Sequence, residues 1–235
     1  MTSAAAFLLW VALLAGIPFA LVIPTLAGAD TDVRSAGSRN PGATNVARLF
    51  GWRMAAPVLA ADVAKGFLPV VVARILWPTW DPWFGWIVAL LAFTGHCFSV
   101  FLEFRGGKGV ATASGGLLAI TPFPTLLSAG LWVVILWAFG RSSVASLCAA
   151  TALVGFCAWL DPGSLPLVVL LAIGIAFTHM ANVRRLVAGA EGPVIRPVVW
   201  GKSPDRAAAA DILGQGPAGG AAPPIWKERP TDPLD

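Results

Sequence analysis

Long apolar stretches, separated by short polar breaks, occupy most of the chain between residues 4 and 181. A transmembrane helix needs about 20 consecutive apolar residues, and fewer where neighbouring protein shelters its backbone. Several breaks carry turn-forming pairs such as Trp77-Pro78 and Asp81-Pro82. The pattern predicts an all-α integral membrane protein, a seven-transmembrane-helix bundle with one short helix, built from segments 4–24, 54–77, 83–102, 109–121, 123–140, 143–160 and 165–181.

Two of these segments need a separate argument. Segment 4–24 has no basic residues before it and is about as long as a membrane span, so we interpret it as the first span and not as a signal peptide. Segment 109–121 is too short to span alone. We count it as a crossing, packed among the other helices, because without it the polar blocks described below would lie on opposite membrane faces.

The basic residues lie on one side of this bundle. The loops at 25–53, 103–108 and 141–142 and the tail after 181 contain every lysine and arginine except Lys65 and Arg74. Cytoplasmic loops carry an excess of these residues. The charge pattern therefore predicts that the N-terminus is outside and the C-terminus is cytoplasmic.

The composition agrees with a single membrane domain. Hydrophobic residues make up 57% of the chain, charged residues 12%, and the mean hydropathy is +0.77, whereas soluble domains carry about 25% charged residues. We assign residues 1–195 to this domain and predict that residues 196–235, rich in Ala, Gly and Pro, form a disordered cytoplasmic tail. The net charge of +4 does not indicate a nucleic-acid partner, because the bases flank apolar segments.

The first polar block runs from Asp32 to Arg53 and contains the string GSRNPGATNVAR at residues 37–48. Small residues let a backbone approach an anion, consecutive N–H groups form an anion-binding nest, and arginine grips phosphate with a fork of donors. A helix beginning near Thr44 would direct its positive end to the same place. The alternative is an ordinary cytoplasmic loop followed by a helix cap. The candidate binding residues are Ser38, Asn40, Gly42, Thr44, Asn45 and Arg48.

The second polar block, Glu103 to Thr112, reads EFRGGKGVAT. It lacks the GxxxxGK[ST] spacing and no strand precedes it, which argues against an NTPase phosphate loop. Lys108 and the N–H groups of a helix start could still hold a phosphate, with Gly106, Gly107 and Gly109 allowing close approach. The alternative is a tight turn whose bases contact lipid headgroups.

The third polar block, His179 to Glu191, reads HMANVRRLVAGAE. His179 and Asn182 are three residues apart and share one helix face. The histidine could be a proton shuttle, an oxyanion donor or a helix C-terminal cap. Arg184 and Arg185 are equally explained as membrane anchors, and Glu191 could orient a nearby arginine instead of contacting a substrate.

Smaller polar features lie inside the apolar segments. Asp62 and Lys65 are three residues apart and are expected to form an ion pair facing the bundle interior. His96 is expected to be a buried histidine with satisfied hydrogen bonds. Ser143, with Ser146 one turn later, lies near the cytoplasmic end of its segment, where serines often bond to their own helix.

Together the three strings resemble those of the bacterial acyl-phosphate:glycerol-3-phosphate acyltransferases, the PlsY family. The matching strings are GSRNPGATNVAR, GHCFSVFLEFRGGKGVAT (95–112) and HMANVRRLVAGAE, and the resemblance covers about residues 4–195. It implies a multi-pass enzyme of the bacterial inner membrane with its site at the cytoplasmic face. The enzyme would move a fatty acyl group from acyl-phosphate to the sn-1 hydroxyl of glycerol 3-phosphate, giving lysophosphatidic acid and phosphate without a metal or other cofactor. A functional link to an enzyme that makes acyl-phosphate is implied as well.

The resemblance also suggests roles for individual residues. It implies catalytic roles for Ser38, Arg48, His179, Asn182 and Glu191, and a glycerol 3-phosphate loop at residues 106–109. Ser143 is a binding candidate on a shorter match. Acyl-phosphate is already activated, so the site must mainly orient the hydroxyl, remove its proton and stabilise the oxyanion. Either His179 or the phosphate of the donor could take that proton, and we favour the phosphate.

Two other classes of protein remain alternatives. A transporter or channel for a small phosphorylated anion would also bring basic blocks to broken helices, but here the blocks are at one face and the chain shows no internal repeat. A scaffold for acidic lipids would explain the bases but not the strings of Gly, Asn and Ser. Phosphate release that depends on glycerol 3-phosphate would separate the enzyme from both.

Overall fold

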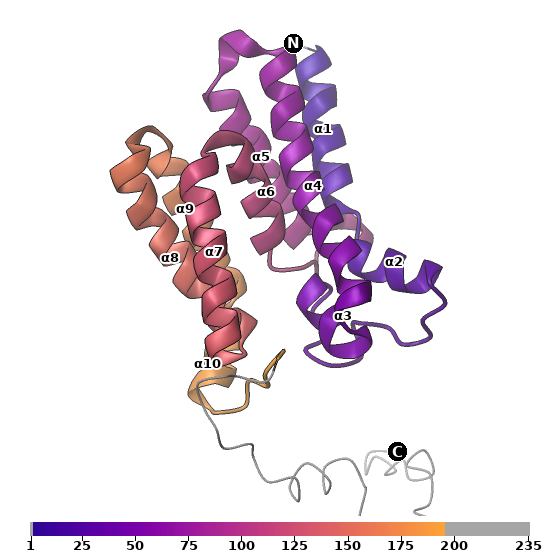
Figure 1. Ribbon diagram of the computed structural model, residues 1–235. Helices are drawn as coiled ribbons and strands as arrows, with labels where there is room; N and C mark the ends of the chain where they lie inside the picture. The colour runs from indigo at the N-terminus through magenta and orange to yellow at the C-terminus, as the bar shows by residue number, and fades with distance from the viewer. Residues whose placement is uncertain (1, 196–235) are drawn as a thin grey trace, which may run out of the picture. The chain divides into compact units, whose positions relative to one another are not determined.

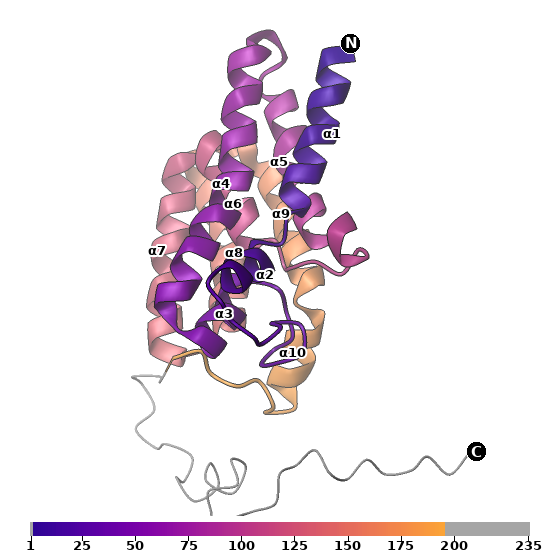
Figure 2. The same cartoon turned by 90° about the vertical axis from the view of Figure 1, so that its right-hand side faces the viewer.

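A computed structural model of the protein describes residues 2–195, and within this range all regular structure is helical (Figures 1 and 2). The predicted tail, 196–235, lies outside the described residues. The α-helices are α1 (Thr2–Gly16), α2 (Phe19–Leu26), α3 (Ala43–Phe50), α4 (Trp52–Leu76), α5 (Trp83–Cys97), α6 (Val110–Ile120), α7 (Pro122–Phe139), α8 (Ser142–Leu160), α9 (Leu165–Thr178) and α10 (Met180–Val187). Short 3-10 turns, η1 (Pro78–Trp80), η2 (Val100–Leu102) and η3 (Pro162–Ser164), join some of them.

The helices reproduce the predicted apolar segments with two breaks. Within residues 2–195, α4, α5 extended through η2, α7 and α8 are each long and apolar enough to cross a membrane. Segment 4–24 is divided into α1 and α2. The last segment, 165–181, corresponds to α9, and α10 continues beyond it; each of these two helix pairs has a bend of 55°. If each bent pair is one span, six helices qualify, and α6 has only 11 residues. The all-helical prediction is confirmed, whereas the number of spans lies between four and six by these criteria.

The break between α1 and α2 is held by polar side chains from other helices. Breaking the helix frees the carbonyls of Gly16 and Ile17, and such groups need partners away from water. The Ser99 hydroxyl donates to the Gly16 carbonyl at 2.6 Å, and Lys65 Nζ donates to the Ile17 carbonyl at 3.0 Å. Lys65 also pairs with Asp62 at 2.9 Å, and both side chains are buried, as the sequence predicted.

Glycines let α4 and α6 pack in close contact. A Cβ atom at Gly66 of α4 would overlap the carbonyl oxygen of Thr112, and one at Gly115 of α6 would overlap the carbonyl oxygen of Val63. Small residues at such positions are typical of helix pairs in membranes, where packing replaces the hydrophobic effect between helices. The contact keeps the start of α6, which follows the second polar block, against the middle of α4.

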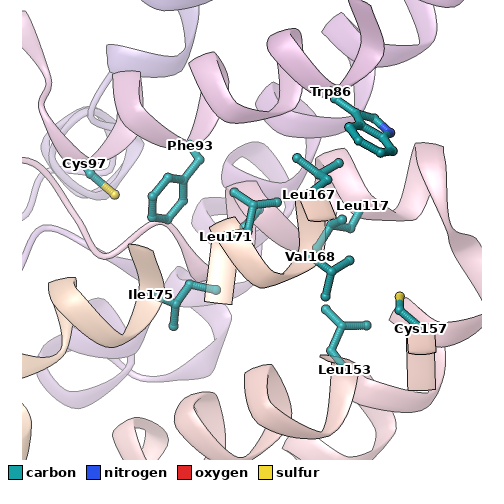
Figure 3. Close-up of a cluster of buried hydrophobic side chains, with 11 residues drawn as sticks. Trp86, Phe93, Cys97, Leu117, Leu153, Cys157, Leu167, Val168, Leu171 and Ile175 are labelled. Carbon is teal, nitrogen blue, oxygen red and sulfur yellow. The ribbon is translucent and has the colours of Figure 1, made fainter. Parts of the chain in front are cut away.

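A buried apolar cluster connects α5, α6, α8 and α9 (Figure 3). Phe93 lies in it next to Gly174, where an added Cβ would come within 2.7 Å of the ring. Cys97 and Cys157 are buried among its apolar side chains. These two thiols therefore pack as small apolar side chains. The cluster fixes α9, which carries the third polar block at its end.

Both views of the chain place parts of the first and third polar blocks at one end of the described helices (Figures 1 and 2). The helices α3 and α10 and the turn between α7 and α8 lie at this end, and the turn between α4 and α5 lies at the other. Segments far apart in sequence thus converge because the intervening helices run back and forth along one another.

Candidate active site

A cavity of about 360 Å³ lies where the three polar blocks converge. Its wall includes side chains from α3, α4, α6, α7 and α8 together with the end of α9 and the start of α10. Of the site residues predicted from sequence, only Gly106 and Gly107 do not line it. The predicted residues that line it are Ser38, Asn40, Gly42, Thr44, Asn45, Arg48, Lys108, Gly109, Ser143, His179, Asn182 and Glu191. The structure therefore brings residues separated by more than 100 positions to one cavity.

The first block is organised by the buried amide of Asn45. Its Nδ2 donates to the carbonyls of Val33 and Ala36 at 2.8 and 3.1 Å, and its Oδ1 accepts from the N–H of Ser38 at 2.8 Å. All of these bonds are within the protein, so Asn45 holds the loop that presents Ser38. Thr44 adds a link across the cavity mouth, because its hydroxyl lies 3.1 Å from that of Ser142 at the start of α8.

Arg48, in the last turn of α3, lines the cavity and contacts the chain that follows α10. Its Nη2 donates to the Gly192 carbonyl at 3.3 Å. Burial lowers the pKa of its guanidinium below the usual value, although the Glu191 carboxylate acts in the opposite sense. Arginine remains protonated in proteins, so Arg48 supplies a partly desolvated positive charge with several donors.

The glycines of the second block are divided between two tasks. The N–H of Gly106 donates to the Cys97 carbonyl at 2.9 Å and that of Gly107 to the His96 carbonyl at 3.2 Å. A Cβ atom at either glycine would overlap His96. The N–H groups of these two residues are thus used within the protein, where they cap the end of α5.

Gly109 and Lys108 face the cavity instead. Gly109 has φ +75°, a backbone conformation that favours glycine, and the next residue begins α6. The first N–H groups of a helix have no partners within it, and they carry partial positive charge. Burial lowers the pKa of the Lys108 ammonium to about 8. The positive charges of Arg185 and Arg48 also lower this pKa, whereas the negative charge of Glu191 raises it.

In the third block, His179 joins α9 to α10 and is almost fully buried. Its Nδ1 lies 2.8 Å from the Ile175 carbonyl, an acceptor, so Nδ1 carries a proton and Nε2 is the free ring nitrogen. The ring both caps the helix end and lines the cavity. The ring therefore contacts the helix end as the cap interpretation expects, and a role as proton shuttle or oxyanion donor stays a prediction.

Glu191 lies at the centre of a group of hydrogen bonds. Its carboxylate accepts from Asn182 Nδ2 at 2.6 Å, from Arg185 Nε at 2.7 Å and from the Ser143 hydroxyl at 3.2 Å. Burial alone would raise its pKa, but these donors outweigh burial and hold the pKa below the usual value. Arg141 Nε bonds to the Glu191 carbonyl at 3.1 Å, which attaches this segment to the turn before α8.

The rest of the cavity is mainly apolar and was not predicted residue by residue. It includes Leu59 and Val63 of α4, Leu117 of α6 and Ala149 and Leu153 of α8. Trp132 of α7 also lines it and donates from Nε1 to the Ser146 hydroxyl at 3.0 Å. No sequence signal singled out Trp132 among the tryptophans of the chain. We call this part the apolar arm.

Asp62 and His96 also line the cavity, and the sequence had placed both only in the bundle interior. The Nδ1 of His96 lies 3.8 Å from Asp62 Oδ1. Among residues 2–195, no group of three or more His, Cys, Asp or Glu side chains is arranged to hold a metal ion.

Comparison with known proteins identifies relatives along most of the chain. The family model described as glycerol-3-phosphate acyltransferase matches residues 5–189. The glycerol-3-phosphate acyltransferase of Solidesulfovibrio magneticus is 44% identical over 190 residues, which cover 80% of this chain and 94% of that protein. The enzyme of Pseudomonas paraeruginosa is 42% identical over 187 residues, covering 76% and 93%.

Solved structures agree with these relatives. The crystal structure of PlsY (YgiH), an integral membrane glycerol 3-phosphate acyltransferase in its glycerol 3-phosphate form, has a TM-score of 0.73 and 34% identity, covering 81% of this chain and 95% of that one. Its lysophosphatidic acid form has a TM-score of 0.72. This chain is therefore an all-helical, multi-pass integral membrane enzyme that belongs to the glycerol-3-phosphate acyltransferase family.

Proposed function

We propose that the cavity binds glycerol 3-phosphate beside an acyl-phosphate and transfers the acyl group to the sn-1 hydroxyl, giving lysophosphatidic acid and phosphate. One observation carries this assignment: a single cavity joins a cationic end, with Arg48 and Lys108, to an apolar arm. An anionic head and an acyl chain would each find a matching environment. The related PlsY crystal structures in glycerol 3-phosphate and lysophosphatidic acid forms support the same pair of small molecules.

Two phosphates require more than one cationic group. Arg48 and Lys108 come from different sides of the cavity, and the start of α6 adds N–H groups beside Lys108. We assign this end to the phosphates, with Ser38, Asn40, Gly42 and Thr44 completing its wall. Gly106 and Gly107 hold the second block in place through backbone hydrogen bonds to α5. Asn45 holds the first block in place through its hydrogen bond from the N–H of Ser38.

The transfer itself needs no external nucleophile from the protein. The sn-1 oxygen attacks the acyl carbonyl carbon, the bond from that carbon to the phosphate oxygen breaks, and the phosphate departs with the hydroxyl proton. The leaving phosphate lies beside the hydroxyl by necessity, so it is our preferred base. His179 would then position the reactants through its free Nε2.

Membrane orientation follows from the same assignment. Counting α1 with α2, α9 with α10, and α6 as one short crossing gives seven crossings, with the N-terminus outside. The positive-inside rule supports placing the cavity at the cytoplasmic face of the bacterial inner membrane. Acyl-phosphate would reach it there from the enzyme that makes it, and residues 1–195 would form the catalytic domain.

The assay that tests this function measures phosphate release from palmitoyl-phosphate by the purified protein in detergent or lipid. We expect release to require glycerol 3-phosphate and to be matched by lysophosphatidic acid. If vesicles containing the protein instead take up glycerol 3-phosphate and no phosphate is released from the donor, the transporter alternative is correct.

His179→Ala is expected to lower kcat by no more than about tenfold, because the donor phosphate takes the proton and general-base catalysis typically contributes about 10²–10⁴. The measurement is steady-state phosphate release at saturating substrates. Met180→Ala, one residue along and exposed, is the control for folding. A loss of about 10³ in kcat, with both KM values unchanged, would assign the proton transfer to His179.

A further inference from the structure

The bonds around Glu191 have a fixed direction. A carboxylate accepts hydrogen bonds and cannot donate them. Asn182 must therefore turn its NH₂ group, and Ser143 its O–H group, toward Glu191 Oε1, at 2.6 and 3.2 Å. The amide orientation of Asn182 is set by chemistry, since the reverse orientation would place two acceptors against each other.

This arrangement leaves unused acceptor capacity on two residues of the cavity wall. Asn182 and Ser143 are each 2% exposed, and both line the cavity. Within the described part of the chain, Asn182 Oδ1 is buried and has no hydrogen-bond partner. A buried acceptor without a partner is costly, and it is rare in proteins unless a ligand or water completes it. A hydroxyl bound against this wall would supply the donor that Asn182 Oδ1 lacks.

The cavity thus separates two kinds of hydrogen-bonding group. Arg48 and Lys108 offer donors and positive charge, whereas Asn182 Oδ1 and the Ser143 oxygen offer acceptors. A phosphate oxygen matches the first kind and an alcohol O–H matches the second. In the proposed reaction the attacking hydroxyl gives its proton to the donor phosphate, so the acceptors are left for a hydroxyl that does not react.

Arg185 keeps the acceptors in place. Its Nε bonds to Glu191 Oε2 at 2.7 Å, and it is the ion-pair partner of this carboxylate. We propose that Arg185 is a positioning residue, which holds Glu191 so that Glu191 in turn orients Asn182 and Ser143. In this orientation the two residues select a polyol phosphate by its secondary hydroxyl, the one that does not react. This inference rests on the proposed function and adds to it the group that each side chain recognises.

The neighbouring arginine provides a contrast. Arg184 is exposed, and its side chain makes no ion pair within residues 2–195. Without Arg185 the pKa of Glu191 would rise, since the Arg185 hydrogen bond is the largest of the effects that lower it. Arg48 and Lys108 also act on this carboxylate through space, and Arg141 bonds only to its backbone carbonyl. Loss of the Arg185 bond also frees the Glu191 carboxylate to move, and Asn182 and Ser143 then lose the fixed acceptor that orients them.

The test compares two acyl acceptors, glycerol 3-phosphate and 3-hydroxypropyl phosphate, which keeps the terminal hydroxyl and the phosphate but lacks the secondary hydroxyl. In the unaltered enzyme we expect kcat/KM to favour glycerol 3-phosphate by about 10–10², the loss expected when a buried acceptor is left without a hydrogen bond. Arg185→Gln should reduce this ratio to within about threefold, mainly through a higher KM for glycerol 3-phosphate. Arg184→Gln should keep the ratio, and Arg185→Lys should restore most of it. The KM for palmitoyl-phosphate should stay unchanged in all three.

Two results would overturn the inference. One is a ratio in Arg185→Gln equal to that of the unaltered enzyme. The other is an equal rise of both KM values, which would indicate general loosening of the site. If Arg185→Gln does not fold, Asn182→Ala gives the same comparison, because it removes the acceptor itself. Failure of the proposed function is distinguishable, since the unaltered enzyme would then acylate neither acceptor.

Discussion

Lys108→Met is expected to reduce kcat/KM for glycerol 3-phosphate by about 10²–10³, because it removes a charge-assisted donor from a partly desolvated anion site. Lys108 lines the cationic end of the cavity beside the start of α6. The measurement is phosphate release from palmitoyl-phosphate at varied glycerol 3-phosphate. Arg105→Met is the matched control, since Arg105 belongs to the same loop but is exposed and does not line the cavity.

The same lysine predicts a dependence on pH. Burial holds the pKa of Lys108 at about 8, so its positive charge is present below that pH and is lost above it. The kcat/KM for glycerol 3-phosphate should therefore fall as the pH rises through about 8, since this parameter reports the free enzyme. A bound phosphate stabilises the ammonium, so the corresponding fall in kcat should occur at higher pH. Lys108→Arg should shift the fall in kcat/KM to higher pH.

Equal losses of kcat/KM in Lys108→Met and Arg105→Met would contradict the assignment of Lys108 to the phosphate site.

Ala149→Phe is expected to lower kcat/KM for palmitoyl-phosphate by about 10² while octanoyl-phosphate is affected by no more than about threefold. Ala149 is a buried residue of the apolar arm on α8, and a ring there would fill space that we assign to the distal part of a long acyl chain. The measurement is the ratio of kcat/KM for the two donors at saturating glycerol 3-phosphate.

The adjacent residue supplies the control. Cys148 is exposed on the same helix and does not line the cavity, so Cys148→Phe adds the same ring outside it. It should leave the ratio of the two donors unchanged. If Ala149→Phe lowers the rates with both donors equally, the distal chain lies elsewhere and the apolar arm has another role.

The two breaks in the helical segments explain one limit of prediction from sequence. Segment 4–24 reads as one continuous span, yet the chain bends by 55° between α1 and α2. The bend is stable because Lys65 and Ser99, distant in sequence, donate hydrogen bonds to the freed carbonyls. No local pattern reports such a partner, and the same holds for the bend at His179.

The glycine-rich loop explains another limit. The sequence correctly indicates that residues 106–109 need small side chains, but it does not indicate what approaches them. For both Gly106 and Gly107 the nearest atom belongs to His96 of the same chain. The atoms nearest to Gly109 belong to Phe93 and Cys97, although Gly109 also lines the cavity. A protein atom and a ligand atom impose the same steric requirement on a glycine.

The sequence by itself determined the helical membrane class, the three polar blocks and the chemistry that these blocks offer, because hydropathy and residue type are local properties. Only the tertiary structure decided which of those groups face one cavity. It separated Arg185, which holds Glu191, from its exposed neighbour Arg184, and it joined a cationic end to an apolar arm that includes Trp132. These distinctions depend on helix rotation and on contacts between residues far apart in the chain, which local pattern does not encode.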